Sequence, residues 1–248
     1  MKWDANKYTN NFSFVHKYGE EVLKLLEIKP NMRVLDLGCG NGELTKKISD
    51  LGVYAIGVDS SEELLSVAKE KHPTIAFMKQ DATNLVLDEP VDAVFSNAVF
   101  HWIPETKQAQ MLRHIFETIK VGGQFVFEFG GYRNNQLIHL ALERSFRARN
   151  LKYRMPFYFP TIAQFATRLE EAGFEVREMS LFHRFTELKG EDGLSDWINM
   201  FIKMPFQGVD AELKKDIIFE AVEDLRSELY QDERWYADYV RIRGKAVR

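Results

Sequence analysis

Short apolar runs alternate along this chain with longer segments in which apolar residues recur every three or four positions. The runs lie at residues 34–37, 53–58, 75–79, 91–95 and 124–129. Runs of this length predict strands, and the three-to-four spacing between them predicts helices. Strands that alternate with helices predict a parallel sheet with helices on its faces.

After Gly131 the pattern predicts two more helices, a strand over residues 174–179 and a final strand over residues 236–247. About fifty residues separate these last two strands. Between the strands, the apolar residues of the stretches 194–204 and 211–230 recur at helical spacing. We interpret the insertion, residues 189–233, as a lid over a functional site. A dimer surface is an equal alternative, so we expect a monomer or a homodimer.

The composition is that of an ordinary globular chain, with 248 residues, 45% hydrophobic content and a net charge of −4. No apolar stretch approaches the ~18 residues of a membrane span, and the first residues lack a signal-peptide apolar region, so we expect a cytoplasmic protein. A single cysteine, Cys39, excludes an intrachain disulfide or a multi-cysteine metal site, and we expect no metal. The acidic balance argues against a nucleic-acid partner.

The most informative segment is residues 34–42, Val-Leu-Asp-Leu-Gly-Cys-Gly-Asn-Gly. Three glycines directly after a strand let the backbone approach a ligand where side chains would block it. A dinucleotide fingerprint reads G-x-G-x-x-G, whereas Gly38, Gly40 and Gly42 read G-x-G-x-G and follow Asp36. The alternative is that a tight strand-to-helix turn needs these glycines only for packing.

Two further acids follow predicted strands. Asp59, before Ser60, stands at the distance at which a Rossmann-type unit places a ribose-binding acid, and Asp81 follows the third strand. Ligands of open parallel sheets bind beyond the carboxyl ends of the strands, so the acids should converge on one crevice. Each acid by itself is also explained as a helix N-cap.

The glycine segment resembles motif I of the class I S-adenosylmethionine-dependent methyltransferases. A wider set of segments looks like the branch related to trans-aconitate 2-methyltransferase: Trp3-Asp4, Tyr8, residues 34–42, Asp59-Ser-Ser61, Asp81-Ala82 and residues 95–102, Phe-Ser-Asn-Ala-Val-Phe-His-Trp. The resemblance implies a Rossmann-like fold of α/β class with a seven-stranded, mostly parallel sheet and an antiparallel last strand. It implies one domain, residues 1–248, with a cofactor-binding core at about residues 30–130. The implied cofactor is S-adenosylmethionine, with S-adenosylhomocysteine as product.

The resemblance also assigns site residues. It implies that Asp81 accepts a hydrogen bond from the adenine amino group and that Asn97, Ala98, His101 and Trp102 line the pocket near the methionine half of the cofactor. The full set of predicted cofactor residues is Tyr8, Asp36, Gly38, Cys39, Gly40, Asn41, Gly42, Asp59, Ser60, Asp81, Ala82, Asn97 and Ala98. His101 and Trp102 are the predicted catalytic-pocket residues, and the alternative for them is a packed aromatic pair.

The acceptor is predicted to be a small carboxylic acid of the trans-aconitate type, methylated to an ester. A carboxylate is already ionised at neutral pH, so its site needs cations rather than a general base. The stretch 133–154 supplies five arginines and a lysine against one acid, although a solvated helix face explains them too. The predicted substrate residues are His101, Phe129, Arg133, Arg144 and Trp197.

Three alternatives stay open. His101 could act as a base if the acceptor were a hydroxyl or an amine of a secondary metabolite or lipid. A second alternative is a non-catalytic module that binds S-adenosylmethionine and signals through the insertion. An NAD-dependent dehydrogenase shares the fold, but the glycine spacing and Asp36 disfavour it.

Overall fold

The computed structural model describes residues 14–248, so the predicted site residue Tyr8 lies outside the described residues. The strands are β1 (Arg33–Leu37), β2 (Tyr54–Asp59), β3 (Ala76–Lys79), β4 (Val91–Asn97), β5 (Ile119–Gly130), β6 (Glu175–Leu188), β7 (Tyr230–Gln231) and β8 (Arg234–Val247). The α-helices are α2 (Phe14–Leu23), α3 (Glu43–Ser49), α4 (Glu62–Lys71), α5 (Glu105–Thr118), α6 (Gln136–Ala148), α7 (Ile162–Glu171), α8 (Gly193–Phe201), α9 (Ala211–Asp224) and α10 (Arg226–Leu229). Short 3-10 turns are η1 (Ala82–Asn84), η2 (Phe100–Trp102) and η3 (Met204–Phe206).

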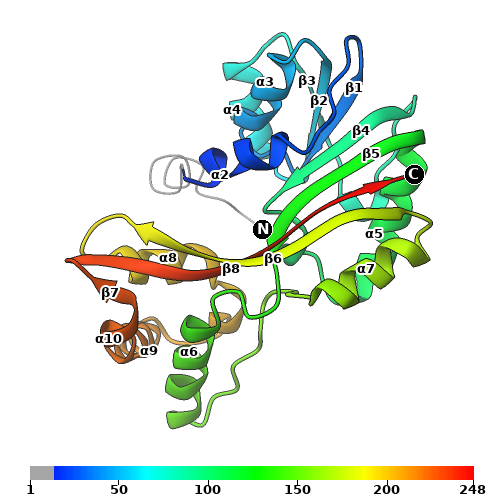
Figure 1. Ribbon diagram of the computed structural model, residues 1–248. Helices are drawn as coiled ribbons and strands as arrows, with labels where there is room; N and C mark the ends of the chain where they lie inside the picture. The colour runs from blue at the N-terminus through cyan, green and yellow to red at the C-terminus, as the bar shows by residue number, and fades with distance from the viewer. Residues whose placement is uncertain (1–13) are drawn as a thin grey trace.

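The strands form one twisted sheet in the order β3-β2-β1-β4-β5-β8-β6 (Figure 1). Strands β1 to β5 pair in parallel, and β8 runs antiparallel to both β5 and β6. The predicted Rossmann-like, mostly parallel sheet with an antiparallel last strand is therefore confirmed. The structure adds the short strand β7, which pairs with β8.

Helices cover both faces of the sheet, because the central strands β1 and β4 and the second half of β5 are buried on both sides. On one face, α2 and α3 pack on Val34, Phe95 and Val126. On the other face, α5 and α7 pack on Leu35 and neighbouring strand residues, including a group of phenylalanines from β5. These two layers hold the carboxyl ends of the parallel strands in fixed positions.

The two longest strands, β6 and β8, extend well beyond the rest of the sheet (Figure 1). The sequence pattern ended β6 near Met179, but the strand continues to Leu188, which pairs with Trp235 of β8. In its second half, exposed residues alternate with partly or fully buried ones, so it lacks the continuous apolar run of the buried strands. The pairing partner, which lies some fifty residues away in sequence, sets the length of β6.

Strand β5 also begins earlier than predicted. It starts at Ile119 and passes through Gly122 and Gly123, where the pairing with β4 is irregular, instead of beginning after a glycine turn. Within residues 14–248, every helix is too short or too polar to cross a bilayer.

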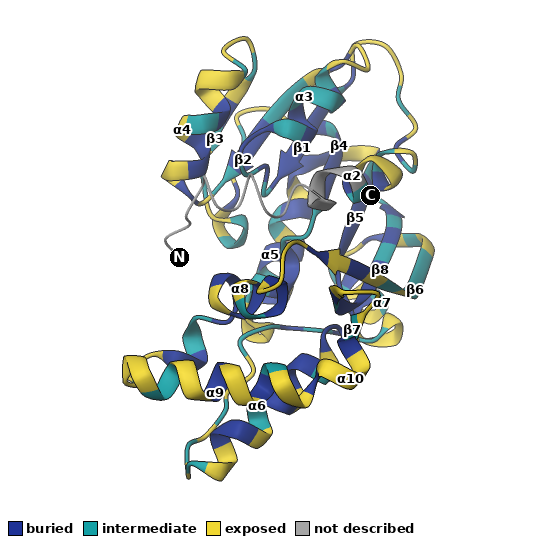
Figure 2. Ribbon diagram, turned by 90° about the vertical axis from the view of Figure 1, so that its left-hand side faces the viewer, coloured by how far each residue is buried: buried dark blue, intermediate teal, exposed yellow. Residues whose placement is uncertain are grey.

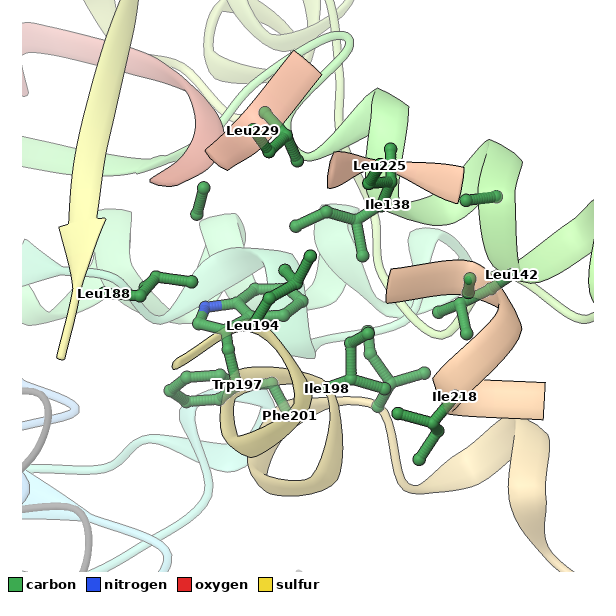
Figure 3. Packing of buried hydrophobic residues seen from close by; sticks show 14 of the residues in the cluster. Ile138, Leu142, Leu188, Leu194, Trp197, Ile198, Phe201, Ile218, Leu225 and Leu229 are labelled. Atoms are coloured by element: carbon green, nitrogen blue, oxygen red, sulfur yellow. The ribbon is translucent and has the colours of Figure 1, made fainter. Parts of the chain in front are cut away.

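The far ends of β6 and β8 carry a second hydrophobic core. Figure 3 shows Ile138 and Leu142 of α6 pointing toward Trp197 of α8 and Ile218 of α9, with Leu188 of β6 at one side. In Figure 2 this distal part, formed by α6 and α8 to α10, lies below the sheet and exposes its outer surface. Residues 189–233 therefore pack as one core with α6, which precedes them by about fifty residues.

Candidate functional site

A cavity of about 430 Å³ opens at the carboxyl ends of the parallel strands. Its wall comes from the segments that follow β1, β2, β3 and β4, together with the first turn of α5. The strand order reverses between β1 and β4, and crevices at such a point are the usual ligand sites of open α/β sheets.

Eight of the predicted cofactor residues line this cavity, and they come from all four strand ends. They are Gly38, Gly40, Asp59, Ser60, Asp81, Ala82, Asn97 and Ala98. Four others, Asp36, Cys39, Asn41 and Gly42, lie behind the wall. Convergence of residues spread over sixty positions is what the parallel topology predicts.

The carboxylate of Asp59 is held in place by the backbone. Its Oδ2 accepts from the Gly40 N–H at 2.9 Å, and its Oδ1 accepts from the Ser61 N–H at 2.8 Å. Burial raises the pKa of Asp59, while these N–H donors oppose the shift. A carboxylate fixed in this way presents its remaining lone pairs toward the cavity, where they suit a pair of hydroxyls.

Asp81 caps the turn η1 with only one of its oxygens. Its Oδ1 accepts from the backbone N–H and the hydroxyl of Thr83, at 2.8 and 2.7 Å. None of the hydrogen bonds found among the described residues uses Oδ2, so this oxygen is available to a ligand donor. Asp81 is thus both the N-cap that local sequence suggests and a cavity residue.

The three glycines of the loop serve two different purposes. A Cβ at Gly38 would lie 2.1 Å from Val99, and a Cβ at Gly42 would lie 2.8 Å from Phe77, so packing excludes side chains there. Around Gly40 the nearest atom belongs to Leu64 at 4.0 Å, and this glycine faces the cavity. Gly40 leaves space for a ligand to approach the backbone, so the loop fits a cofactor. For Gly38 and Gly42, the alternative interpretation is correct that packing requires a glycine.

Asp36 is buried in the sheet and supports the loop from below. The Thr45 hydroxyl donates to its Oδ2 at 2.6 Å. Burial raises the pKa of Asp36 to about 7, and the Thr45 hydrogen bond opposes this shift. Neighbouring Asn41 is also buried, and its amide oxygen and nitrogen have no partner within residues 14–248.

Cys39 packs against Leu65, Ala68 and Phe77 as a small apolar residue. Burial raises the pKa of its thiol, which removes the thiolate that redox chemistry requires. In the part of the chain that the structure describes, no cluster of His, Cys, Asp or Glu could hold a metal ion.

The segment after β4 carries backbone strain at the cavity. Ala98 has φ 62°, a left-handed conformation that costs a non-glycine residue about 1 to 3 kcal/mol. Its N–H donates to the Glu128 carbonyl at 2.7 Å, which holds the conformation. Strain of this kind concentrates at ligand sites.

His101 and Trp102 lie side by side, with ring centroids 5.3 Å apart, and only Trp102 lines the cavity. The His101 ring is buried, and its Nδ1 accepts from the Gly130 N–H at 3.3 Å. Burial first, and then the nearby Arg241 charge, lower the pKa of His101 well below its ordinary value. The ring is therefore neutral, with its proton on Nε2.

The structure contradicts three of the predicted substrate residues. Phe129 is fully buried against Phe100 and Phe165, and Trp197 is buried in the distal core, where its Nε1–H donates to the Tyr239 hydroxyl. Arg144 binds Asp224 of α9 at 2.5 and 2.9 Å, and it is absent from the wall of the cavity at the strand ends. Helical spacing and residue type could not distinguish these core and pairing roles from substrate contacts.

The other arginines of the stretch 133–154 differ in whether they pair with an acid. Arg147 pairs with Glu143, and Arg149 pairs with Glu220 of α9. Arg133 instead lines a second cavity, next to the first.

Several cavity residues were missed by sequence reasoning. They are Leu37, Val58, Leu64, Gln80, Thr83, Val99, Ile103, Pro104 and Lys107. Gln80 and Thr83 flank a predicted acid and could have been included by proximity. Lys107 carried no signal, because only the placement of α5 brings its first turn to the cavity.

Comparisons with known proteins find methyltransferases. A family model described as "Methyltransferase domain" matches residues 34–123. An uncharacterized methyltransferase of Schizosaccharomyces pombe is 27% identical, over 97% of this chain and 96% of its own length.

Two relatives with named substrates match over part of their length. Malonyl-[acyl-carrier protein] O-methyltransferase of Bacillus anthracis is 28% identical, over 64% of this chain and 61% of the relative. Trans-aconitate 2-methyltransferase of Rhizobium rhizogenes is 32% identical, over 50% of this chain and 48% of the relative. Among solved structures, magnesium protoporphyrin IX methyltransferase of Synechocystis with bound S-adenosylhomocysteine superposes with TM-score 0.56 at 18% identity, covering 95% of this chain and 82% of that one.

Proposed function

We propose that this chain, a class I S-adenosylmethionine-dependent methyltransferase, transfers the methyl group to a carboxylate oxygen of a small-molecule acid. S-adenosylmethionine, when bound, supplies a methyl group on a positively charged sulfur that a carboxylate oxygen attacks directly. The protein must then position the acid and exclude water, effects worth up to ~7 to 11 kcal/mol.

In this proposal the first cavity holds the cofactor. Asp59 binds the ribose hydroxyls, the free Oδ2 of Asp81 accepts from the adenine amino group, and the backbone at Gly40 contacts the cofactor closely. The support is that these groups line one cavity and keep unused acceptors or open space.

One observation favours a carboxylate over a hydroxyl or an amine. The Gly130 N–H occupies the lone pair on Nδ1 of His101, so the neutral ring offers an N–H donor at Nε2 and no acceptor. A hydroxyl or amine acceptor would have to lose a proton to a base, which His101 in this state cannot take up. A carboxylate is already ionised at neutral pH and needs no base.

The relatives support the same class of acceptor. Trans-aconitate is a polycarboxylate, and the malonyl group of malonyl-[acyl-carrier protein] ends in a carboxylate. These substrates belong to the relatives, and for this chain they define the first compounds to test.

The test measures S-adenosylhomocysteine formation with trans-aconitate, with a malonyl thioester and with hydroxyl and amine compounds of similar size, and identifies each product by mass. We expect a methyl ester from at least one acid, at a rate that is flat between pH 6 and pH 9. A product methylated only on a hydroxyl or amine would overturn the carboxylate assignment. Binding of S-adenosylhomocysteine without turnover on any acceptor would favour the non-catalytic module.

A further inference from the structure

A second cavity, of about 760 Å³, lies next to the cofactor cavity, and both cavities have Ile103 and Pro104 in their walls. It lies at the junction of the two parts of the molecule, between α6 and Met204 on the distal side and the start of α5 on the other. Cavities of this size at such junctions bind small molecules.

Several aromatic rings line this cavity. Phe157 and Phe159 lie 5.4 Å apart between ring centroids, and His139 lies 5.6 Å from Phe157. Aromatic rings in offset or edge contact favour a flat partner of similar shape. The wall therefore suits a ligand with a planar apolar body.

One buried polar atom in the wall has no partner. The Nε2 of His139 makes no hydrogen bond within the described residues, although the side chain is only 4% exposed. The other ring nitrogen, Nδ1, lies 2.7 Å from the Tyr153 hydroxyl. Burial lowers the pKa of His139 to about 3, so the ring stays neutral. A buried polar atom without a partner is costly, and a polar group on a ligand would satisfy it.

The charges around the cavity favour an anion. Both acids in its wall are neutralised, Glu105 by Arg168 at 2.7 Å and Glu143 by Arg147 at 3.1 Å. Arg133, in the same wall, has no acidic partner among residues 14–248, and its guanidinium lies over the Tyr132 ring at 5.3 Å. The unbalanced charge is positive, and an arginine suits bidentate binding of a carboxylate.

We propose that the second cavity binds an organic anion with a flat apolar body, whose carboxylate pairs with Arg133 and whose rings lie against Phe157 and Phe159. Assigning this anion as the methyl acceptor rests on the proposed function. The link between the two cavities is Trp102 of the first, which contacts Phe157 of the second at 4.8 Å between ring centroids.

The probe is 2-naphthoate, titrated by calorimetry into the full chain with S-adenosylhomocysteine present. We expect Arg133→Gln to weaken binding about tenfold or more, because a charge-assisted hydrogen bond is lost. The matched control is Arg113→Gln, which removes the same charge at an exposed position of α5 that lines neither cavity. Arg113→Gln should leave the affinity unchanged.

A second variant tests the volume. Leu140 lies in the wall and is 41% exposed, so Leu140→Trp should fill the cavity and abolish binding without damage to the core. Val86→Trp, at a position that is 67% exposed and outside the cavity wall, is the control. The site would be overturned if 2-naphthoate did not bind at millimolar concentration. It would also be overturned if Arg133→Gln and Leu140→Trp both bound 2-naphthoate with the affinity of the wild type.

The acceptor assignment has its own readout. We expect 2-naphthoate to raise the KM of the acid acceptor without lowering kcat, and purely noncompetitive behaviour would remove the assignment. If no acid is methylated, the proposed function fails, whereas direct binding of 2-naphthoate still decides whether the cavity is a site.

Discussion

The two ends of the molecule use polar residues in opposite ways. At the carboxyl ends of β1 to β4, buried or fixed acids surround a cavity and keep unused acceptors, as Asp59 and Asp81 do. At the distal end, Arg144 of α6 and Arg149, which follows this helix, form ion pairs with acids of α9. Residue type alone therefore does not identify a binding site, because the tertiary partner decides whether a charge is available.

The largest expected effect is a loss of stability in the distal core that leaves the cavity at the strand ends unchanged. Trp197→Ala removes a large side chain from the distal core and should lower the free energy of unfolding by about 3 to 5 kcal/mol. Urea unfolding measures this loss, and calorimetry under native conditions should show unchanged affinity for S-adenosylhomocysteine. A parallel loss of cofactor affinity would mean that the two parts are not independent.

The next effect tests the raised pKa of Asp36, which lies beneath the glycine loop. The pKa of Asp36 is raised to about 7 by burial, so the folded protein holds this proton more tightly than the unfolded chain does. Its contribution to stability is therefore greatest below about pH 4 and is lost as the pH rises to about 7, at roughly 1.4 kcal/mol per unit of pKa shift. The free energy of unfolding of the wild type should fall from pH 5 to pH 8 by more than that of Asp36→Asn, which cannot titrate. Parallel pH profiles would contradict the raised pKa.

Loss of the proposed ribose ligand should act on binding rather than on folding. Asp59→Ala removes a carboxylate that holds Gly40 and faces the cavity, and should weaken S-adenosylhomocysteine binding at least about 100-fold. Asp88→Ala, at an exposed loop position, is the control. Similar affinities in the two variants, measured by calorimetry, would rule out the assigned role of Asp59.

A smaller effect separates packing from backbone conformation. Gly38 and Gly52 have nearly the same φ, 79° and 81°, but a Cβ at Gly38 would clash with Val99, whereas nothing lies within 4 Å at Gly52. Gly52→Ala should cost about 1 kcal/mol of unfolding free energy and Gly38→Ala about 2 kcal/mol or more. Equal losses in urea unfolding would show that Val99 moves aside freely.

The smallest effect is expected from the exposed ion pair of α6. Arg144→Ala should cost only about 0.2 to 1 kcal/mol of stability, since both partners are half exposed, and should leave methyl transfer unchanged. A large rise in KM for the proposed acid acceptor would restore Arg144 as a substrate residue.

The sequence by itself determined which acids lie at the first cavity. Alternating strands and helices specify a parallel sheet, and in such a sheet the residue after each strand must reach the same edge, so Asp59 and Asp81 converge whatever else the chain does. The glycine loop could be recognised because the conformational freedom of glycine is a property of the residue itself, whereas only the structure distinguished Gly40 from Gly38 and Gly42.

Only the tertiary structure decided the rest. Strand β6 is long because β8 pairs with its second half, and Trp197 is core because α6, distant in sequence, packs beside it. The pairing of Arg144 with Asp224 depends on where α9 lies, and among residues 14–248 no acid lies in a comparable position next to Arg133. Contacts between distant segments carry no local sequence period, so the second cavity became visible only in the folded molecule.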